Sequence, residues 1–120
     1  MGNSNSNFVN LDEKEKSIFS FKVKLVKISV EKGKKKFTKS MPNYKFKLKL
    51  YPSSLTLKND NYKLDFNYYN IKSWTNEKQF FSFQTIDKDT YMFLTENNIN
   101  ASVISEALTD ICNNIKNKTN

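Results

Sequence analysis

Residues 44–50 read Tyr44-Lys45-Phe46-Lys47-Leu48-Lys49-Leu50, in which apolar side chains alternate strictly with lysines. Successive side chains of an extended strand point to opposite faces of its sheet. The pattern therefore predicts a half-buried strand with an apolar core face and a lysine-bearing outer face. Pro52-Ser53-Ser54 then turns this strand into the next one, over residues 55–58.

Further strands flank this stretch on both sides. Residues 21–25 alternate in the same way, and the change of phase at Leu25-Val26 predicts a β-bulge. The basic segment Glu31–Lys39 is expected to be a loop. Short strands are expected over residues 62–67, 71–75, 79–85 and 91–95, with a tight turn at residues 59–61.

The period of the apolar residues changes after Thr95. They recur at three- and four-residue spacing, which predicts one amphipathic helix near Ile99–Ile115. Its apolar stripe comprises Ile99, Val103, Ile104, Ala107, Leu108, Ile111, Cys112 and Ile115, and its outward face comprises Ser105, Glu106, Thr109 and Asn113. The predicted fold class is mainly β (α+β), with about seven antiparallel strands in a bent sheet or partly open barrel that the helix caps.

This order of elements resembles the pleckstrin-homology-like (PH-like) superfold over residues 21–115. Phe46–Leu57 resembles the strand–turn–strand of its phosphotyrosine-binding and FERM C-lobe branch, with Ser54 where a glycine is frequent. Tyr69–Trp74, Phe80–Phe83 and Tyr91–Glu96 resemble the fifth, sixth and last strands of that branch. The resemblance implies two sites: a basic headgroup pocket at the first inter-strand loop, and a peptide groove between the fifth strand and the C-terminal helix.

In this chain the implied peptide groove comprises Ile71, Lys72, Ser73, Trp74 and Thr75. Trp74 is the only tryptophan, and it either anchors a peptide or packs in the core under the helix. Phosphotyrosine-reading members generally contact phosphate through arginine, which this chain lacks. The expected ligand of the groove is therefore an unphosphorylated peptide that adds to the sheet edge.

The composition argues against catalysis. The net charge is +8, and every basic residue is a lysine. With no histidine, no glycine-rich phosphate loop and no ligand set at calcium-loop spacing, we expect no catalytic residue, cofactor or metal site. Cys112 is interpreted as a small core residue, and a single cysteine suits a cytosolic chain. The sequence has no run of about 18 apolar residues, so no transmembrane helix is predicted.

Two features indicate a membrane surface. Met1-Gly2-Asn3-Ser4-Asn5-Ser6 matches the N-myristoylation pattern, in which Gly2 accepts the acyl chain. The lysines of the basic segment are expected to bind anionic lipid; they are Lys32, Lys34, Lys35, Lys36 and Lys39. One myristoyl chain binds only marginally, and each lysine near an anionic surface adds on the order of 1 kcal/mol, so the two signals together suffice.

The strand lysines allow two interpretations. They are Lys22, Lys24, Lys45, Lys47 and Lys49. They either solvate an exposed sheet face or, if their two strands pair, join the basic segment in one surface.

We therefore expect residues 1–17 to be a flexible acylated arm, residues 18–117 a PH-like domain and residues 118–120 a disordered tail. The expected function is that of a peripheral adaptor on the cytoplasmic face of a membrane, with a further soluble cytosolic pool, that binds a protein or peptide partner or anionic lipid. Two alternatives stay open: an anionic-lipid or phosphoinositide sensor with no peptide partner, and non-specific nucleic-acid binding. The last is disfavoured because most strand aromatics face inward, away from the lysines.

Overall fold

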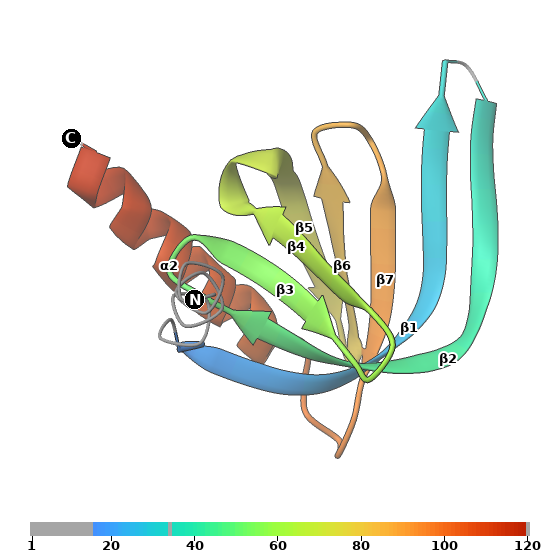
Figure 1. Cartoon of the computed structure of the whole chain (residues 1–120), viewed down its shortest axis with the longest axis horizontal. Helices are drawn as coiled ribbons and strands as arrows, with labels where there is room; N and C mark the ends of the chain where they lie inside the picture. Colours follow the sequence, from blue (N-terminus) through green and yellow to red (C-terminus); the bar gives the residue numbers. More distant parts are fainter. Residues whose placement is uncertain (1–15, 34, 120) are drawn as a thin grey trace, which may run out of the picture.

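The computed structural model describes residues 16–33 and 35–119. These residues form one antiparallel sheet of seven strands and a C-terminal helix (Figure 1), which confirms the predicted fold class. The strands are β1 (Phe19–Lys32), β2 (Lys35–Leu50), β3 (Ser54–Lys58), β4 (Lys63–Asn67), β5 (Ile71–Glu77), β6 (Phe80–Thr85) and β7 (Thr90–Thr95). A short 3-10 helix, η1 (Tyr68–Asn70), links β4 to β5, and the C-terminal helix is α2 (Ser102–Thr119).

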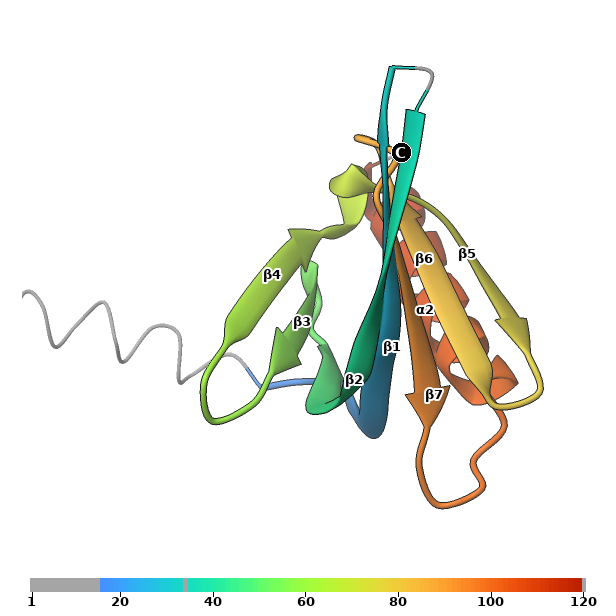
Figure 2. The ribbon, with the colours of Figure 1, turned by 90° about the vertical axis from the view of Figure 1, so that its right-hand side faces the viewer.

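The strand order is β4-β3-β2-β1-β7-β6-β5, so β4 and β5 are the two edges of an open sheet. Figure 2 shows β1 between the two halves, with β2–β4 on one side and β5–β7 on the other. The helix α2 packs against β5 and β6. This arrangement is compatible with a PH-like fold. No helix in the described part of the chain is both long and apolar enough to cross a bilayer.

The sheet changes register at the predicted bulge. The pairing of β1 with both β2 and β7 shifts between Leu25 and Lys27. On β2 the pairing passes from Tyr44 to Ser40 across the same point. A bulge bends its strand and re-aims the side chains that follow it. After the bulge, Ile28 is again on the core side of the sheet, where it pairs with Tyr91 and packs against the core.

The basic segment at residues 31–39 is not a loop, and that prediction was wrong. β1 continues to Lys32 and β2 begins at Lys35, so the segment forms the end of a long hairpin (Figure 1). Gly33 has a φ of +62°, a left-handed conformation that glycine adopts without steric cost. Lysine is only weakly disfavoured in strands, and the ladder with β1 overrides that preference.

The core lies between the two halves of the sheet and is rich in aromatic side chains. The ring of Phe83 on β6 stacks on Phe93 and Tyr91 of β7, with centroid distances of 6.0 and 5.2 Å. Phe66 on the edge strand β4 meets Phe83 edge-on at 5.1 Å. These aromatic contacts join the two halves of the sheet where no backbone ladder connects β4 to β5.

The helix α2 supplies the remaining wall of the core. Ile104 and Leu108 are fully buried and Ile111 is 5% exposed, as the apolar stripe predicts. Val103 departs from the prediction, because it is 44% exposed. Ser105 also departs from it: its Oγ is buried and has no hydrogen-bond partner among the described residues.

The ends of α2 differ from the predicted ends. The helix begins at Ser102, whose backbone N–H donates to Oδ1 of Asn100 at 2.9 Å. Ile99 lies in the preceding loop, where its carbonyl accepts a hydrogen bond from Oγ1 of Thr95. The helix continues to Thr119.

Candidate functional site

A row of lysines crosses the outer face of the first half of the sheet. Lys22 on β1 is the cross-strand partner of Lys47 on β2. Lys47 is in turn the partner of Lys58 on β3, and Lys58 is the partner of Lys63 on β4. Paired residues of an antiparallel sheet project from the same face. Four ammonium groups therefore lie side by side across four strands.

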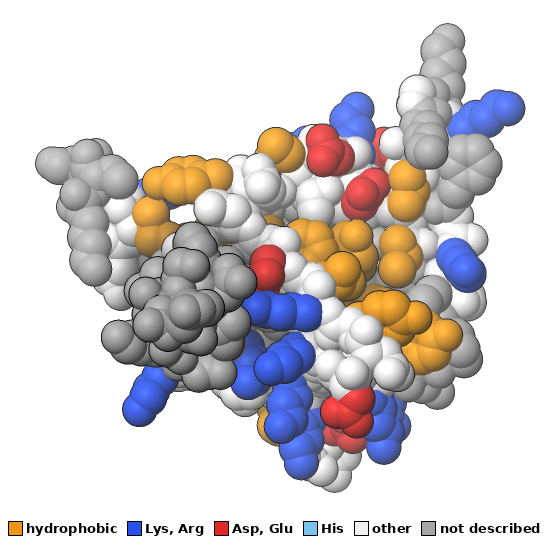
Figure 3. Space-filling view, viewed as in Figure 1, with side chains coloured by type: hydrophobic (Ala, Val, Ile, Leu, Met, Phe, Trp, Pro, Cys, Tyr) orange, Lys and Arg blue, Asp and Glu red, His pale blue; other side chains and the backbone are white. Residues whose placement is uncertain are grey.

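Three further lysines share this face. Lys24 and Lys45 are cross-strand partners at the outward position next to Lys22 and Lys47. Lys49 follows Lys47 at the next outward position of β2. Figure 3 shows lysine side chains gathered over this region, in the lower middle of the view. We define the lysine face by these residues: Lys22, Lys24, Lys45, Lys47, Lys49, Lys58 and Lys63.

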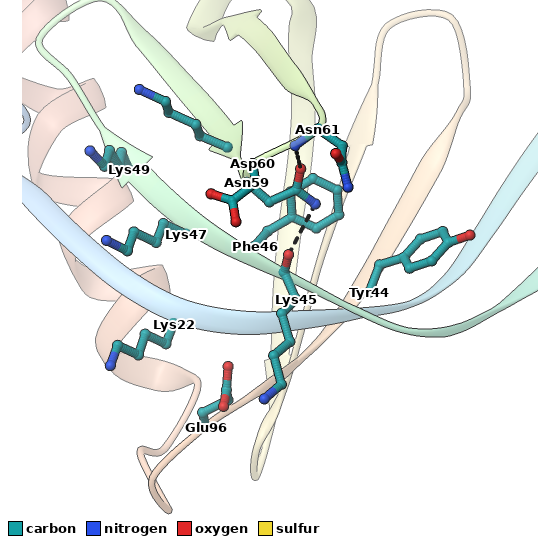
Figure 4. A pocket seen from close by; sticks show the side chains of 11 residues that line it. Lys22, Tyr44, Lys45, Phe46, Lys47, Lys49, Asn59, Asp60, Asn61 and Glu96 are labelled. Atoms are coloured by element: carbon teal, nitrogen blue, oxygen red, sulfur yellow. Dashed lines mark hydrogen bonds between the residues drawn. The ribbon is translucent and has the colours of Figure 1, made fainter.

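An open depression of about 640 Å³ lies on the lysine face (Figure 4). Its lining includes five members of the face together with the β3–β4 turn; the lining residues are Lys22, Tyr44, Lys45, Phe46, Lys47, Lys49, Lys58, Asn59, Asp60, Asn61 and Glu96. Figure 4 shows the side chains of Lys22, Lys47 and Lys49 projecting to the same side.

The turn beside the depression is held by one asparagine. Oδ1 of Asn59 accepts hydrogen bonds from the backbone N–H groups of Asn61 and Tyr62, at 2.8 and 2.7 Å. Nδ2 of Asn59 donates to the carbonyl of Lys45 at 3.1 Å, which ties the turn to β2. The rim of the depression is therefore fixed by the fold before any ligand binds.

The lysine face has an excess of positive charge. Its carboxylates are Asp60 and Glu96 at the depression and Asp65 on β4, whose Oδ1 accepts a hydrogen bond from Oγ1 of Thr56 at 2.6 Å. Seven lysines and three carboxylates leave a formal charge of +4 on this face. Within residues 16–33 and 35–119, no ion pair neutralises any of the seven lysines.

This charge is costly for the sheet. Adjacent strands lie about 4.8 Å apart, well within the Debye length of about 8 Å at physiological ionic strength. Like charges directly opposite each other on a sheet are destabilising. An external polyanion would relieve the repulsion, so the face is suited chemically to binding an anionic surface or ligand.

The predicted anionic-lipid residues of the basic segment lie elsewhere. Lys35 and Lys39 are exposed on the β1–β2 hairpin, whereas Lys34 lies outside the described residues. Lys39 is the partner of Ile28, which pairs with Tyr91 and packs against the core. Lys39 therefore projects from the face opposite to Lys47 and does not extend the lysine face. Lys32 and Lys36 lie on the hairpin strands next to the turn.

The predicted peptide groove falls on the edge strand β5. Ile71 is 8% exposed and Trp74 is partly buried against the core, while the other three residues are exposed: Lys72, Ser73 and Thr75. Thr75 on the outer side exchanges a hydrogen bond with Ser82 of β6, with 2.8 Å between Oγ1 and Oγ. In the described sheet no strand pairs with the free edge of β5, and α2 lies nearby. Trp74 thus contributes to the core while its strand edge stays open.

The predicted acylation site, Gly2, lies outside the described residues. The described chain starts at Lys16, and its first backbone contact is from the N–H of Ile18 to the carbonyl of Leu50, at 2.7 Å. Ser20 is the cross-strand partner of Lys49. The segment that carries Gly2 therefore joins the domain next to the lysine face.

Cys112 is a free cysteine that is partly buried on α2. Burial raises the pKa of the Cys112 thiol, and the nearby Lys116 ammonium opposes this shift to a smaller extent. A raised pKa leaves less of the reactive thiolate at neutral pH. No group of three or more histidine, cysteine, aspartate or glutamate side chains suited to a metal ion occurs in the part of the chain that the structure describes.

Sequence reasoning missed part of this site. It identified the lysines of β1 and β2 and predicted the turn at residues 59–61, but it did not place Lys58, Lys63 or that turn at the site. The available signal was the short spacing through Pro52-Ser53-Ser54, which brings residues 55–58 back along β2 and sets Lys58 against Lys47. No family model matches this chain, and no curated protein is significantly similar to it in sequence.

Proposed function

We propose that this protein is a PH-like, peripheral membrane module, nearest the phosphotyrosine-binding and FERM C-lobe branch, that acts as an adaptor on the cytoplasmic face of a membrane. The observation that carries the proposal is the concentration of unneutralised lysines on one outer sheet face. Lysine is a hydrated point charge, suited to diffuse attraction by anionic headgroups rather than to bidentate recognition. The absence of arginine fits the same mode of binding.

The Gly2 motif supplies the second signal. A single myristoyl chain gives only marginal, reversible attachment to a bilayer. Basic residues near an anionic leaflet make the attachment stable, because each adds on the order of 1 kcal/mol to the binding free energy. An acyl chain on Gly2 together with the lysine face is a sufficient pair.

The proposal predicts that Gly2→Ala releases the protein from membranes. The acylated protein should float with vesicles that contain phosphatidylserine, whereas Gly2→Ala should stay largely unbound at physiological salt. Binding of the acylated protein should weaken as salt is added, because exposed charges are screened. Equal recovery of both proteins on membranes would rule out the acyl anchor, and intact mass would confirm the acyl adduct.

The adaptor role needs a surface that stays free on the membrane. The open edge of β5 offers unpaired backbone groups to an extended partner. Because Trp74 packs against the core, Trp74→Ala is expected to lower the free energy of unfolding, whereas Trp74→Phe should largely preserve it. If Trp74→Phe stays folded but loses a partner that the wild type captures, the indole contributes to docking. A partner retained by folded Trp74→Phe would place Trp74 in the core alone.

The depression favours a second candidate function, the sensing of one phosphorylated headgroup. Its five lysines and the fixed Asn59 turn surround a space of about 640 Å³. A sensor should bind vesicles with a polyphosphorylated inositol lipid much more tightly than vesicles of equal charge made with phosphatidylserine. Equal binding at matched charge would favour diffuse attraction and hence the adaptor.

A further inference from the structure

We infer that the outer face of β1–β4, and not the tip of the β1–β2 hairpin, is the surface that lies on the membrane. The inference rests on the proposed function and names the part of the domain that performs it. The partner is an anionic lipid bilayer. In this orientation the lysine face contacts headgroups, while the hairpin tip and the β5 edge remain in water.

Charge complementarity is the first argument. The row Lys22, Lys47 and Lys58 sets like charges directly opposite each other, which opposes folding of the sheet. No carboxylate among the described residues forms an ion pair with these three side chains. A negative surface against the row would relieve the repulsion. Binding of that surface should therefore also stabilise the folded state.

The hairpin has one directly opposed pair of lysine positions, Lys32 and Lys35, and not a row that crosses four strands. Its Glu31 is the cross-strand partner of Lys36. The exposed Lys39 projects from the opposite side of the sheet to Lys47. A bilayer that contacted Lys39 and the rest of its face could not lie against the lysine face at the same time.

The attachment point of the N-terminal segment is the second argument. Residues 2–15 lie outside the described chain, and the segment joins the domain at Lys16, close to the pairing of Ser20 with Lys49. An anchor tethered at this point reaches the adjoining surface of the domain at the lowest cost in chain entropy. An acyl chain on Gly2 therefore inserts most readily beside the lysine face.

The test compares three triple variants of the acylated protein, each with the same loss of charge. The face variant is Lys22→Gln, Lys47→Gln and Lys58→Gln. The hairpin variant is Lys32→Gln, Lys35→Gln and Lys39→Gln. The far-half variant is Lys72→Gln, Lys78→Gln and Lys88→Gln, at exposed positions on β5 and the turns of the second half of the sheet. Partition coefficients are measured with vesicles of phosphatidylcholine containing phosphatidylserine.

The face variant should lose roughly 100-fold in partition, because three lysines leave the headgroup region. The other two variants should lose less than about threefold, because their lysines lie beyond a Debye length from the bilayer. The face variant should stay folded, since its substitutions remove like-charge repulsion. Equal losses in all three variants, or a larger loss in the hairpin variant, would overturn the inference. A wild-type protein that does not bind the vesicles would instead overturn the proposed function.

A second measurement reports orientation without removing any lysine. In a Cys112→Ser background, a fluorescent label is attached through Asn61→Cys beside the depression or through Asn76→Cys on β5. Both positions are exposed in the domain. On vesicle binding, the label at position 61 should become protected from an aqueous quencher, and the label at position 76 should stay accessible. The reverse pattern would contradict the orientation.

Discussion

At the scale of the residue, burial changes the chemistry of a few side chains. Tyr91 on β7 stacks on Phe83 in the core at 5.2 Å. Desolvation raises the pKa of its hydroxyl above the ordinary value of 10.0, and the negative charge of Asp89 raises it further. Both effects disfavour the phenolate in the folded state.

Tyr91 should therefore contribute to alkaline unfolding. Below about pH 10 the phenol is protonated in both states, so the free energy of unfolding does not depend on it. Above that pH the unfolded state ionises first, and stability falls until the folded-state pKa is reached. Denaturant titrations at increasing pH should show a shallower fall in Tyr91→Phe. The control is Tyr69→Phe, at a position that is 72% exposed, and its stability should follow that of the wild type. Identical curves for all three proteins would contradict a contribution of Tyr91 to alkaline unfolding.

At the scale of the element, α2 divides into a buried side and an exposed side that differ from the predicted stripe. Leu108 is fully buried, whereas Val103 is 44% exposed although it belongs to the same sequence pattern. The helix covers β5 and β6, so only the side chains turned toward those strands enter the core. The width of the buried stripe is set by this packing and not by hydrophobicity alone.

The loss of stability caused by a substitution on α2 should depend on how deeply the substituted side chain is buried. Leu108→Ala should lower the free energy of unfolding by about 2–5 kcal/mol, because it removes buried methyl groups and leaves a cavity. Val103→Ala should change it by less than about 0.5 kcal/mol, because little buried area is lost and alanine favours the helix. Urea denaturation followed by circular dichroism measures both. A large loss in Val103→Ala would mean that Val103 belongs to the buried stripe.

At the scale of the whole molecule, the net charge of +8 acts on stability as well as on binding. About half of this excess lies on the lysine face, where neighbouring strands place ammonium groups opposite one another. Self-repulsion of this kind destabilises a compact state and is reduced by salt. Binding to an anionic surface should offset this repulsion and stabilise the folded domain.

Added salt should therefore raise the melting temperature of the wild type. Between about 0.02 and 0.3 M sodium chloride the Debye length falls below the spacing of the more distant lysines, so a rise of a few degrees is expected. The face variant, Lys22→Gln, Lys47→Gln and Lys58→Gln, should rise less. Thermal melts followed by circular dichroism provide the comparison. A melting temperature independent of salt in the wild type would show that the lysines do not interact appreciably.

The sequence by itself determined the local structure. Alternation at residues 44–50 placed Phe46 and Leu48 in the core and Lys47 outside it, and the change of period after Thr95 determined the helix. The bulge near Leu25 was also readable, because a phase slip is a local signal. Such features depend on residues only a few positions apart in the sequence, so the sequence alone predicts them.

Only the tertiary structure determined which lysines stand together. The row from Lys22 to Lys63 depends on the register of four strands, and a one-residue slip would move every side chain of a strand to the other face. The strand pairing also converted the expected loop at residues 31–39 into a hairpin, and the bulge turned Lys39 away from Lys47. Register is fixed by long-range hydrogen bonding and core packing, so the lysine face is a property of the fold, although each of its lysines can be read from the sequence.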